Sequence, residues 1–413
     1  MMRSRNRQSM MVSLVAGVML AGAGPASSAD DLEPYKMIRS LQFIQDSIVL
    51  GDHSANEMQR FLLKTLDQRL RTIGPEAFKD TRNVDAVFMF AMSGGNPQTL
   101  EYLASRDIEG DFDIRLTRVL RRYLQGQGVS ALPAFDELVK EYTASDVGPY
   151  LALVAGNTTA GVEPQKALAY FDQARLLAPG TNLEEAALRR SLAITLHLSD
   201  YPRSTDIAGK YVRRFLYSPY ASQFVDMFVQ LVVDGDGTIT RDQWTDIVAM
   251  MDDERAKELY MRVARRAVLA GKQDLARDAA ARAEQLGSTT ASDGKSVSRL
   301  YGDLANVSTA KVTDTAESLS RIPDEALSER DKMLRDAARN IAEQIVMPVS
   351  AASGDAAAPA TDRAMTGAVV PAAETQPGDP PTIQPDANFK SYVDTNRSKL
   401  MQIDEMLKGE IRK

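Results

Sequence analysis

Apolar residues recur at helical spacing through almost the whole stretch from residue 32 to residue 347. Sustained alternation of apolar and polar residues, which marks a half-buried strand, does not occur there. The pattern therefore predicts an all-α fold that needs no sheet. The first helix is expected from about Pro34, and it carries four apolar residues on one face: Met37, Leu41, Ile44 and Ile48.

Local signals predict where several of the following helices begin and end. Ser54 and Glu57 have the spacing of a capping box, which opens a helix with Met58, Leu62, Leu66 and Leu70 on one stripe. The segment Thr81–Met92 is apolar nearly all round and should be buried. Asn96 and Pro97 suit the N-cap and first position of the next helix. Further helices are expected around Ile114–Leu124, Ala131–Tyr142 and Val147–Ala155.

The last helix of this stretch is expected to open at a second capping box, Ser328–Asp331, and to stop before Pro348. Its predicted inward face consists of Leu334, Ala338, Ile341 and Ile345.

A small–aromatic–small pattern marks the later part of the chain. Ala167, Phe171, Ala174 and Pro179 follow the spacing of the second helix of a tetratricopeptide unit, in which small residues let a partner helix approach. The positions expected in the first helix of a tetratricopeptide unit match poorly, apart from the small residue Ala155. We expect an irregular array of helical hairpins, a tetratricopeptide-like solenoid, with a non-repetitive bundle as the alternative. The weaker echoes are Ala208, Val212, Phe215 and Pro219, then Ala276, Ala280, Ala283 and Leu286.

Composition divides the chain into five segments. Residues 1–29 have three arginines, a 14-residue apolar stretch and small residues at the end, which is typical of a secretory signal peptide. Residues 30–145 are expected to form an N-terminal helical domain, and residues 146–347 the tetratricopeptide-like hairpins. Residues 348–387 are predicted to be a disordered linker, because 350–387 hold 11 alanines and 6 prolines. Residues 388–413 return to heptad spacing and predict an amphipathic helix.

The signal peptide implies export, and we expect a periplasmic protein without stable membrane insertion after cleavage. An uncleaved membrane anchor is the alternative, although the apolar stretch is short for a span of about 20 residues.

Composition also excludes several classes of function. The sequence has no cysteine and only two histidines, which rules out disulfides, thiol nucleophiles and zinc sites built on cysteine or three histidines. The net charge is −7, and it becomes −10 without the three arginines of residues 1–29. Nucleic acid and anionic lipids repel such a chain. We therefore expect no nucleic-acid partner, no catalytic site, no cofactor and no metal.

Two chemical alternatives remain open. The Asp234–Ile239 segment resembles a calcium loop, but Val232 and Gln243 occupy the positions at which an EF-hand needs its first carboxylate and its bidentate glutamate. A cell-wall enzyme would have to use carboxylates, for which the candidates are Asp111, Asp113 and Glu137.

Interaction is the better-supported role, and two regions are candidate partner-binding sites. Tyrosine and arginine are common anchors of protein interfaces, and they crowd one short segment. The predicted C-terminal helix is marginal alone, so its apolar side should dock on the body, on a second copy by self-association, or on another protein. The candidate residues are Arg213, Arg214, Tyr217 and Tyr220 in the body, and Phe389, Val393, Leu400, Ile403 and Leu407 in the tail.

The segments Glu33–Met58 and Arg213–Ala221, together with the Ala/Pro linker before a C-terminal helix, resemble the MotC family of periplasmic motility proteins. The resemblance implies a protein that is required for flagellar rotation and that associates with the periplasmic part of the stator protein MotB. It transfers no functional residue, because no catalytic motif defines the family. A general adaptor for envelope assembly, with the same fold and another client, is the alternative function.

Overall fold

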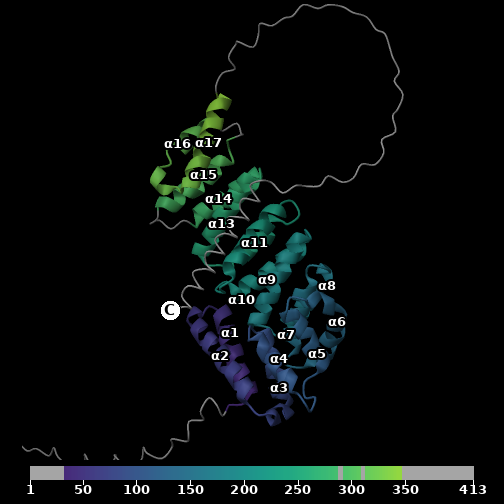
Figure 1. Cartoon of the computed structure of the whole chain (residues 1–413). Coiled ribbons are helices and arrows are strands. Elements are labelled where there is room, and N and C mark those ends of the chain that lie inside the picture. The colour runs from purple at the N-terminus through teal and green to yellow at the C-terminus, as the bar shows by residue number, and fades with distance from the viewer. Residues whose placement is uncertain (1–31, 287–291, 308–311, 347–413) are drawn as a thin grey trace, which may run out of the picture. The chain divides into compact units, whose positions relative to one another are not determined.

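The computed structural model describes residues 32–286, 292–307 and 312–346 (Figure 1). In these ranges the regular elements are seventeen α-helices and short 3-10 turns, without a strand, which confirms the all-α prediction. The first eight helices are α1 (Pro34–Val49), α2 (Asn56–Thr72), α3 (Thr81–Met92), α4 (Pro97–Arg106), α5 (Ile114–Leu124), α6 (Leu132–Glu141), α7 (Gly148–Thr159) and α8 (Pro164–Leu177).

The later helices also follow one another with short connections. They are α9 (Asn182–His197), α10 (Tyr201–Phe215), α11 (Ala221–Asp234), α12 (Arg241–Val248), α13 (Asp253–Leu269), α14 (Gln273–Gln285), α15 (Ser292–Leu304), α16 (Val312–Ser320) and α17 (Glu329–Val346). None of the helices in the described ranges combines the length and apolar character needed to cross a bilayer.

Capping residues set several helix starts where the sequence predicts them. The Asn96 side chain accepts from the Gln98 amide at 3.1 Å, and Pro97 is the first residue of α4. Asp113 accepts from the amides of Arg115 and Leu116 at the start of α5. The α3 helix buries eight of its twelve residues, as its continuous apolar character requires.

Helices that follow each other in the chain pack together, most closely α7 with α8 and α13 with α14 (Figure 1). The next most extensive contacts are those of α9 with α8 and with α10, and of α14 with α15. The helix α8 carries the small–aromatic–small pattern, and α10 and α14 carry its weaker echoes. The alanines of these patterns are buried. In α8 the fully buried Phe171 ring lies against Gly156 of α7, where an added Cβ would come within 2.5 Å of the ring. The small residue that receives the ring is therefore Gly156, next to the predicted Ala155. An all-α helical array is confirmed, and its tetratricopeptide-like character stays a prediction.

The predicted capping box at Ser54 is wrong. The Asp52 carboxylate accepts from both the amide and the hydroxyl of Ser54, and this turn forms a 3-10 helix before α2. Of the predicted α2 stripe, Leu66 and Leu70 are buried, whereas Met58 is exposed. Asp52 takes the capping role instead of Ser54, because its charged carboxylate accepts a stronger hydrogen bond from the amide two residues further along the chain.

The predicted inward face of α17 is half wrong. Ala338 and Ala342 are buried, whereas Ile341 and Ile345 are exposed. The inward side also holds the guanidinium of Arg335, which binds the loop before the helix. Ser328 does open the helix, because its hydroxyl accepts from the Asp331 amide.

The apolar core of the described residues forms two clusters that meet in α9. One cluster runs from Met37 to Ala187, and the other from Leu188 to Ala342 with Val49 of α1 added. The division into domains at residues 145 and 146 stays a prediction. Residues 1–29, the linker 348–387 and the tail 388–413 lie outside the described ranges, and so do the tail candidates Phe389, Val393, Leu400, Ile403 and Leu407.

Candidate partner-binding surface

The four candidate residues of the body, from Arg213 to Tyr220, occupy the end of α10 and the turn into α11. All four are exposed, with Tyr217 at 54% and Tyr220 at 43%. The turn is fixed internally, because the Ser218 hydroxyl accepts from the Tyr220 amide at 3.2 Å. The structure therefore presents these residues on a defined corner of the fold.

Arg214 is held by a carboxylate beneath it. Its Nη1 donates to both oxygens of Glu184, at 2.8 and 2.7 Å. The Glu184 side chain is only 7% exposed and also accepts from the Gly180 amide at 2.6 Å. This arrangement positions the Arg214 guanidinium, which is still half exposed.

Tyr220 is held by the neighbouring Arg189, which is itself held by a second buried carboxylate, Glu185. The Arg189 guanidinium lies 4.2 Å from the centre of the Tyr220 ring. Arg189 Nε donates to Glu185 at 3.0 Å, and the Tyr211 hydroxyl donates to the same carboxylate at 2.9 Å. Burial, followed by the charge of Glu185, raises the pKa of Tyr211 well above its usual range, so this hydroxyl stays protonated.

Tyr217 joins segments that are far apart in the sequence. The Arg255 guanidinium of α13 lies 4.5 Å from the centre of its ring, and Arg255 pairs with Asp252. On the other side lies Gly51, in the turn between α1 and α2. Gly51 has φ of +117°, and an added Cβ would come within 2.9 Å of Tyr217 Cβ. Both conditions favour glycine at this position.

We call Arg189, Arg214, Tyr217, Tyr220 and Arg255 the Arg–Tyr surface. Sequence reasoning found three of its members and missed Arg189 and Arg255, which come from other helices and give no local signal. Arg213 is not part of it. Arg213 instead lines a groove of about 450 Å³ between α10 and α12, with Asp206, Asp246 and Met250.

A second groove, of about 630 Å³, lies where α1, α3, α7 and the start of α9 come together. Sequence reasoning did not predict it. The Asp46 carboxylate in this groove accepts from the Asn182 amide at 2.8 Å. Burial raises the pKa of Asp46, and this hydrogen bond opposes the rise. At the same groove Arg82 stacks on Tyr35, 4.1 Å from the ring centre, so the lining mixes both charges.

One carboxylate of each chemical alternative, Asp113 and Asp236, is engaged in structural contacts. Burial alone would raise the pKa of Asp113, but hydrogen bonds from Arg115, Tyr142 and two amides hold it below its usual value, which is unsuited to a general acid. In the glycine-rich turn, Asp236 pairs with Arg241 at 2.8 Å. The described ranges hold no group of three or more side chains able to bind a metal ion.

Comparison with known proteins gives the family. The family model described as "Chemotaxis protein MotC" matches residues 2–412. A relative from Rhizobium meliloti (strain 1021), "Chemotaxis protein MotC", is 42% identical over 421 residues, which cover 96% of this chain and 97% of the relative. No solved structure matches the chain. These two matches show that the chain belongs to the MotC family of chemotaxis and motility proteins.

Proposed function

We propose that this chain is a non-enzymatic periplasmic scaffold that is required for flagellar rotation and that binds the periplasmic part of the stator protein MotB. Family membership supports the role in motility. The Arg–Tyr surface supports the role in binding, and it is the observation on which the proposal depends. Two tyrosine rings lie half exposed over arginines that carboxylates hold in place.

Such a surface suits recognition for two physical reasons. Tyrosine and arginine supply a large share of the binding free energy at protein interfaces. Side chains that are already fixed lose little conformational entropy on binding, so more of their contact energy contributes to affinity. The C-terminal segment, residues 388–413, is proposed as a second contact, either with the partner or with another copy.

A binding experiment with paired variants tests the proposal. The full chain is titrated with the purified periplasmic region of MotB, and Kd is measured by calorimetry. The double variant Tyr217→Ala/Tyr220→Ala should raise Kd by about tenfold or more. Tyr102→Ala is the matched control, because Tyr102 also stacks with arginines, Arg71 and Arg106, but belongs to α4.

The proposal predicts that the control binds like the wild type and that both proteins keep their helical circular dichroism. Equal affinity of the double variant and the wild type would exclude the Arg–Tyr surface as the binding site. No binding by the folded wild type would favour the envelope-assembly adaptor instead. In cells, the double variant should restore swimming poorly to a strain that lacks this protein, whereas the control should restore it.

Deletion of Asn388–Lys413 tests the tail separately. The deletion should weaken partner binding or self-association and leave the thermal midpoint of the helical signal unchanged. Unchanged binding and unchanged oligomeric state, measured by sedimentation, would remove the tail from the proposal. Sequencing the N-terminus of the protein recovered from the periplasmic fraction tests whether residues 1–29 are cleaved.

A further inference from the structure

Two adjacent arginines of α9 differ in whether a carboxylate pairs with their charge. Arg189 pairs with Glu185 and stacks on Tyr220. Arg190 forms no ion pair and no hydrogen bond with any residue that the structure describes, and its Nη1 is shielded from solvent without an acceptor. An arginine stays charged in proteins, so Arg190 keeps a positive charge without a direct ion pair among the residues that the structure describes.

The surroundings of Arg190 do not compensate for its charge. Burial, followed by repulsion from Arg189, lowers the pKa of Arg190. The charge of Glu185 acts in the opposite direction and raises the pKa of Arg190, but the Glu185 carboxylate already accepts from Arg189 and Tyr211. The free protein therefore holds a partly buried guanidinium at an energetic disadvantage.

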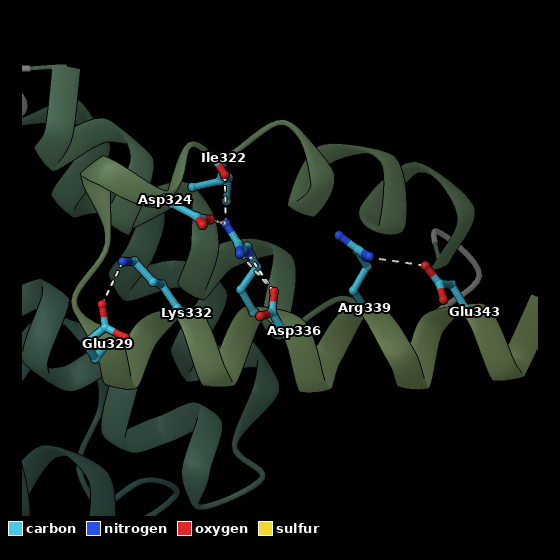
Figure 2. A network of polar contacts seen from close by, with 8 residues as sticks. Ile322, Asp324, Glu329, Lys332, Asp336, Arg339 and Glu343 are labelled. Atoms are coloured by element: carbon cyan, nitrogen blue, oxygen red, sulfur yellow. Dashed lines mark hydrogen bonds and ion pairs between the residues drawn. The ribbon is translucent and has the colours of Figure 1, made fainter.

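Another buried arginine shows how the same fold neutralises such a group. The Arg335 side chain is 10% exposed, and Nη1 donates to the Ile322 carbonyl at 3.0 Å and to Asp324 at 2.6 Å (Figure 2). Its Nη2 also donates to Asp336 at 2.9 Å. Arg335 is thus surrounded by acceptors, whereas Arg190 has none among the described residues.

We propose that Arg190 is a binding residue for a carboxylate side chain of the protein partner, beside the Arg–Tyr surface. This inference rests on the proposed function, because it takes the partner to dock at that surface. A guanidinium binds a carboxylate through two parallel hydrogen bonds, which fixes orientation as well as charge. Arg190 is only partly buried, and of its nitrogens only Nη1 is among the shielded, unpartnered atoms, so a carboxylate can approach the rest of the guanidinium. A glutamate or aspartate of the partner would supply the missing counter-ion.

The same substitution at the two adjacent positions separates a binding role from a structural one. Arg190→Met removes an uncompensated charge, so the thermal midpoint of the free full chain should stay equal or rise. Arg189→Met leaves the buried Glu185 without its arginine, so the midpoint should fall. The affinity of Arg190→Met for the periplasmic region of MotB should drop by about tenfold or more.

A small carboxylate tests the site without the protein partner. Glutarate should raise the thermal midpoint of the wild type above that in chloride at equal ionic strength, and Arg190→Met should abolish the difference. A fall in the midpoint of Arg190→Met as large as that of Arg189→Met would show a structural role and overturn the proposal. Equal glutarate responses, or an unchanged MotB affinity, would also overturn it. A glutarate response that depends on Arg190 in a protein that does not bind MotB would refute only the proposed function.

Discussion

Glycine-to-alanine substitutions in two helices should have opposite effects on stability. Gly156 of α7 faces the Phe171 ring, and an added Cβ would lie 2.5, 2.7 and 3.0 Å from three of its atoms. Gly209 of α10 faces Ile247, whose nearest atom would lie 3.7 Å from the added Cβ, an ordinary contact. Both glycines lie inside helices, so the gain in helix propensity is the same and only the packing differs.

The magnitudes follow from these contacts. Alanine is favoured over glycine in a helix interior by about 1 kcal/mol. Forcing a methyl group against a fully packed ring costs up to about 3 kcal/mol, so Gly156→Ala should lower the free energy of unfolding by about 2 kcal/mol net. Gly209→Ala keeps the full gain of about 1 kcal/mol. The thermal midpoint of Gly156→Ala should therefore fall by about 4 °C, and that of Gly209→Ala should rise by about 2 °C.

Thermal and urea unfolding of the full chain, followed by circular dichroism at 222 nm, measures both variants. A rise in both midpoints would refute the reasoning, because helix propensity would then outweigh the contact with Phe171. A fall in both would refute it too, because the space at Gly209 would then not accept a methyl group. Gly156→Ala/Phe171→Leu supplies a further check. Removing the ring should make the alanine tolerable, so the double variant should lose less than the sum of the single losses.

Three other predictions concern charges. Burial, followed by the charge of Asp146, raises the pKa of Asp85 in the folded protein above 3.8. The protonated Asp85 carboxyl therefore contributes stability below pH 3.8, and this contribution is lost as the pH rises and the carboxyl ionises. Asp85→Asn should therefore lose less stability than the wild type between pH 4 and pH 7, measured by urea unfolding. Arg214→Ala leaves the buried Glu184 carboxylate with the Gly180 amide as its remaining partner, and should cost about 1–2 kcal/mol in the same assay. Calcium at millimolar concentration should leave the fluorescence of the buried Trp244 unchanged, and a saturable change would revive the calcium-loop alternative.

Helix positions were predictable where local chemistry decides them. The bounds of α3 and α5 agree with prediction because an N-cap aspartate and a continuous or periodic apolar face specify each helix independently of its neighbours. Apolar spacing was insufficient in α17. Its large residues Ile341 and Ile345 define one stripe and its alanines another, and only the packing partner determines which stripe turns inward.

The candidate surface was predictable only in part, for a related reason. Arg214, Tyr217 and Tyr220 stand close together in the sequence, so their composition draws attention. Arg189 and Arg255 reach the same place through tertiary packing, and a single sequence carries no sign of that proximity. Arg190 looks like Arg189 in the sequence, and only the structure shows that one is paired and the other is not.

The contact between Gly51 and Tyr217 makes the proposed binding surface a discontinuous epitope. Its components come from α9, from the α10–α11 corner and from α13, and the turn after α1 supports Tyr217 from a fourth segment. Scanning with short overlapping peptides should therefore miss it, because no single peptide contains enough of it. Photo-crosslinking from one position on the bound partner should instead label several separate tryptic fragments. A protein that lacks residues 1–51 should lose part of the support for Tyr217, because Gly51 lies against it.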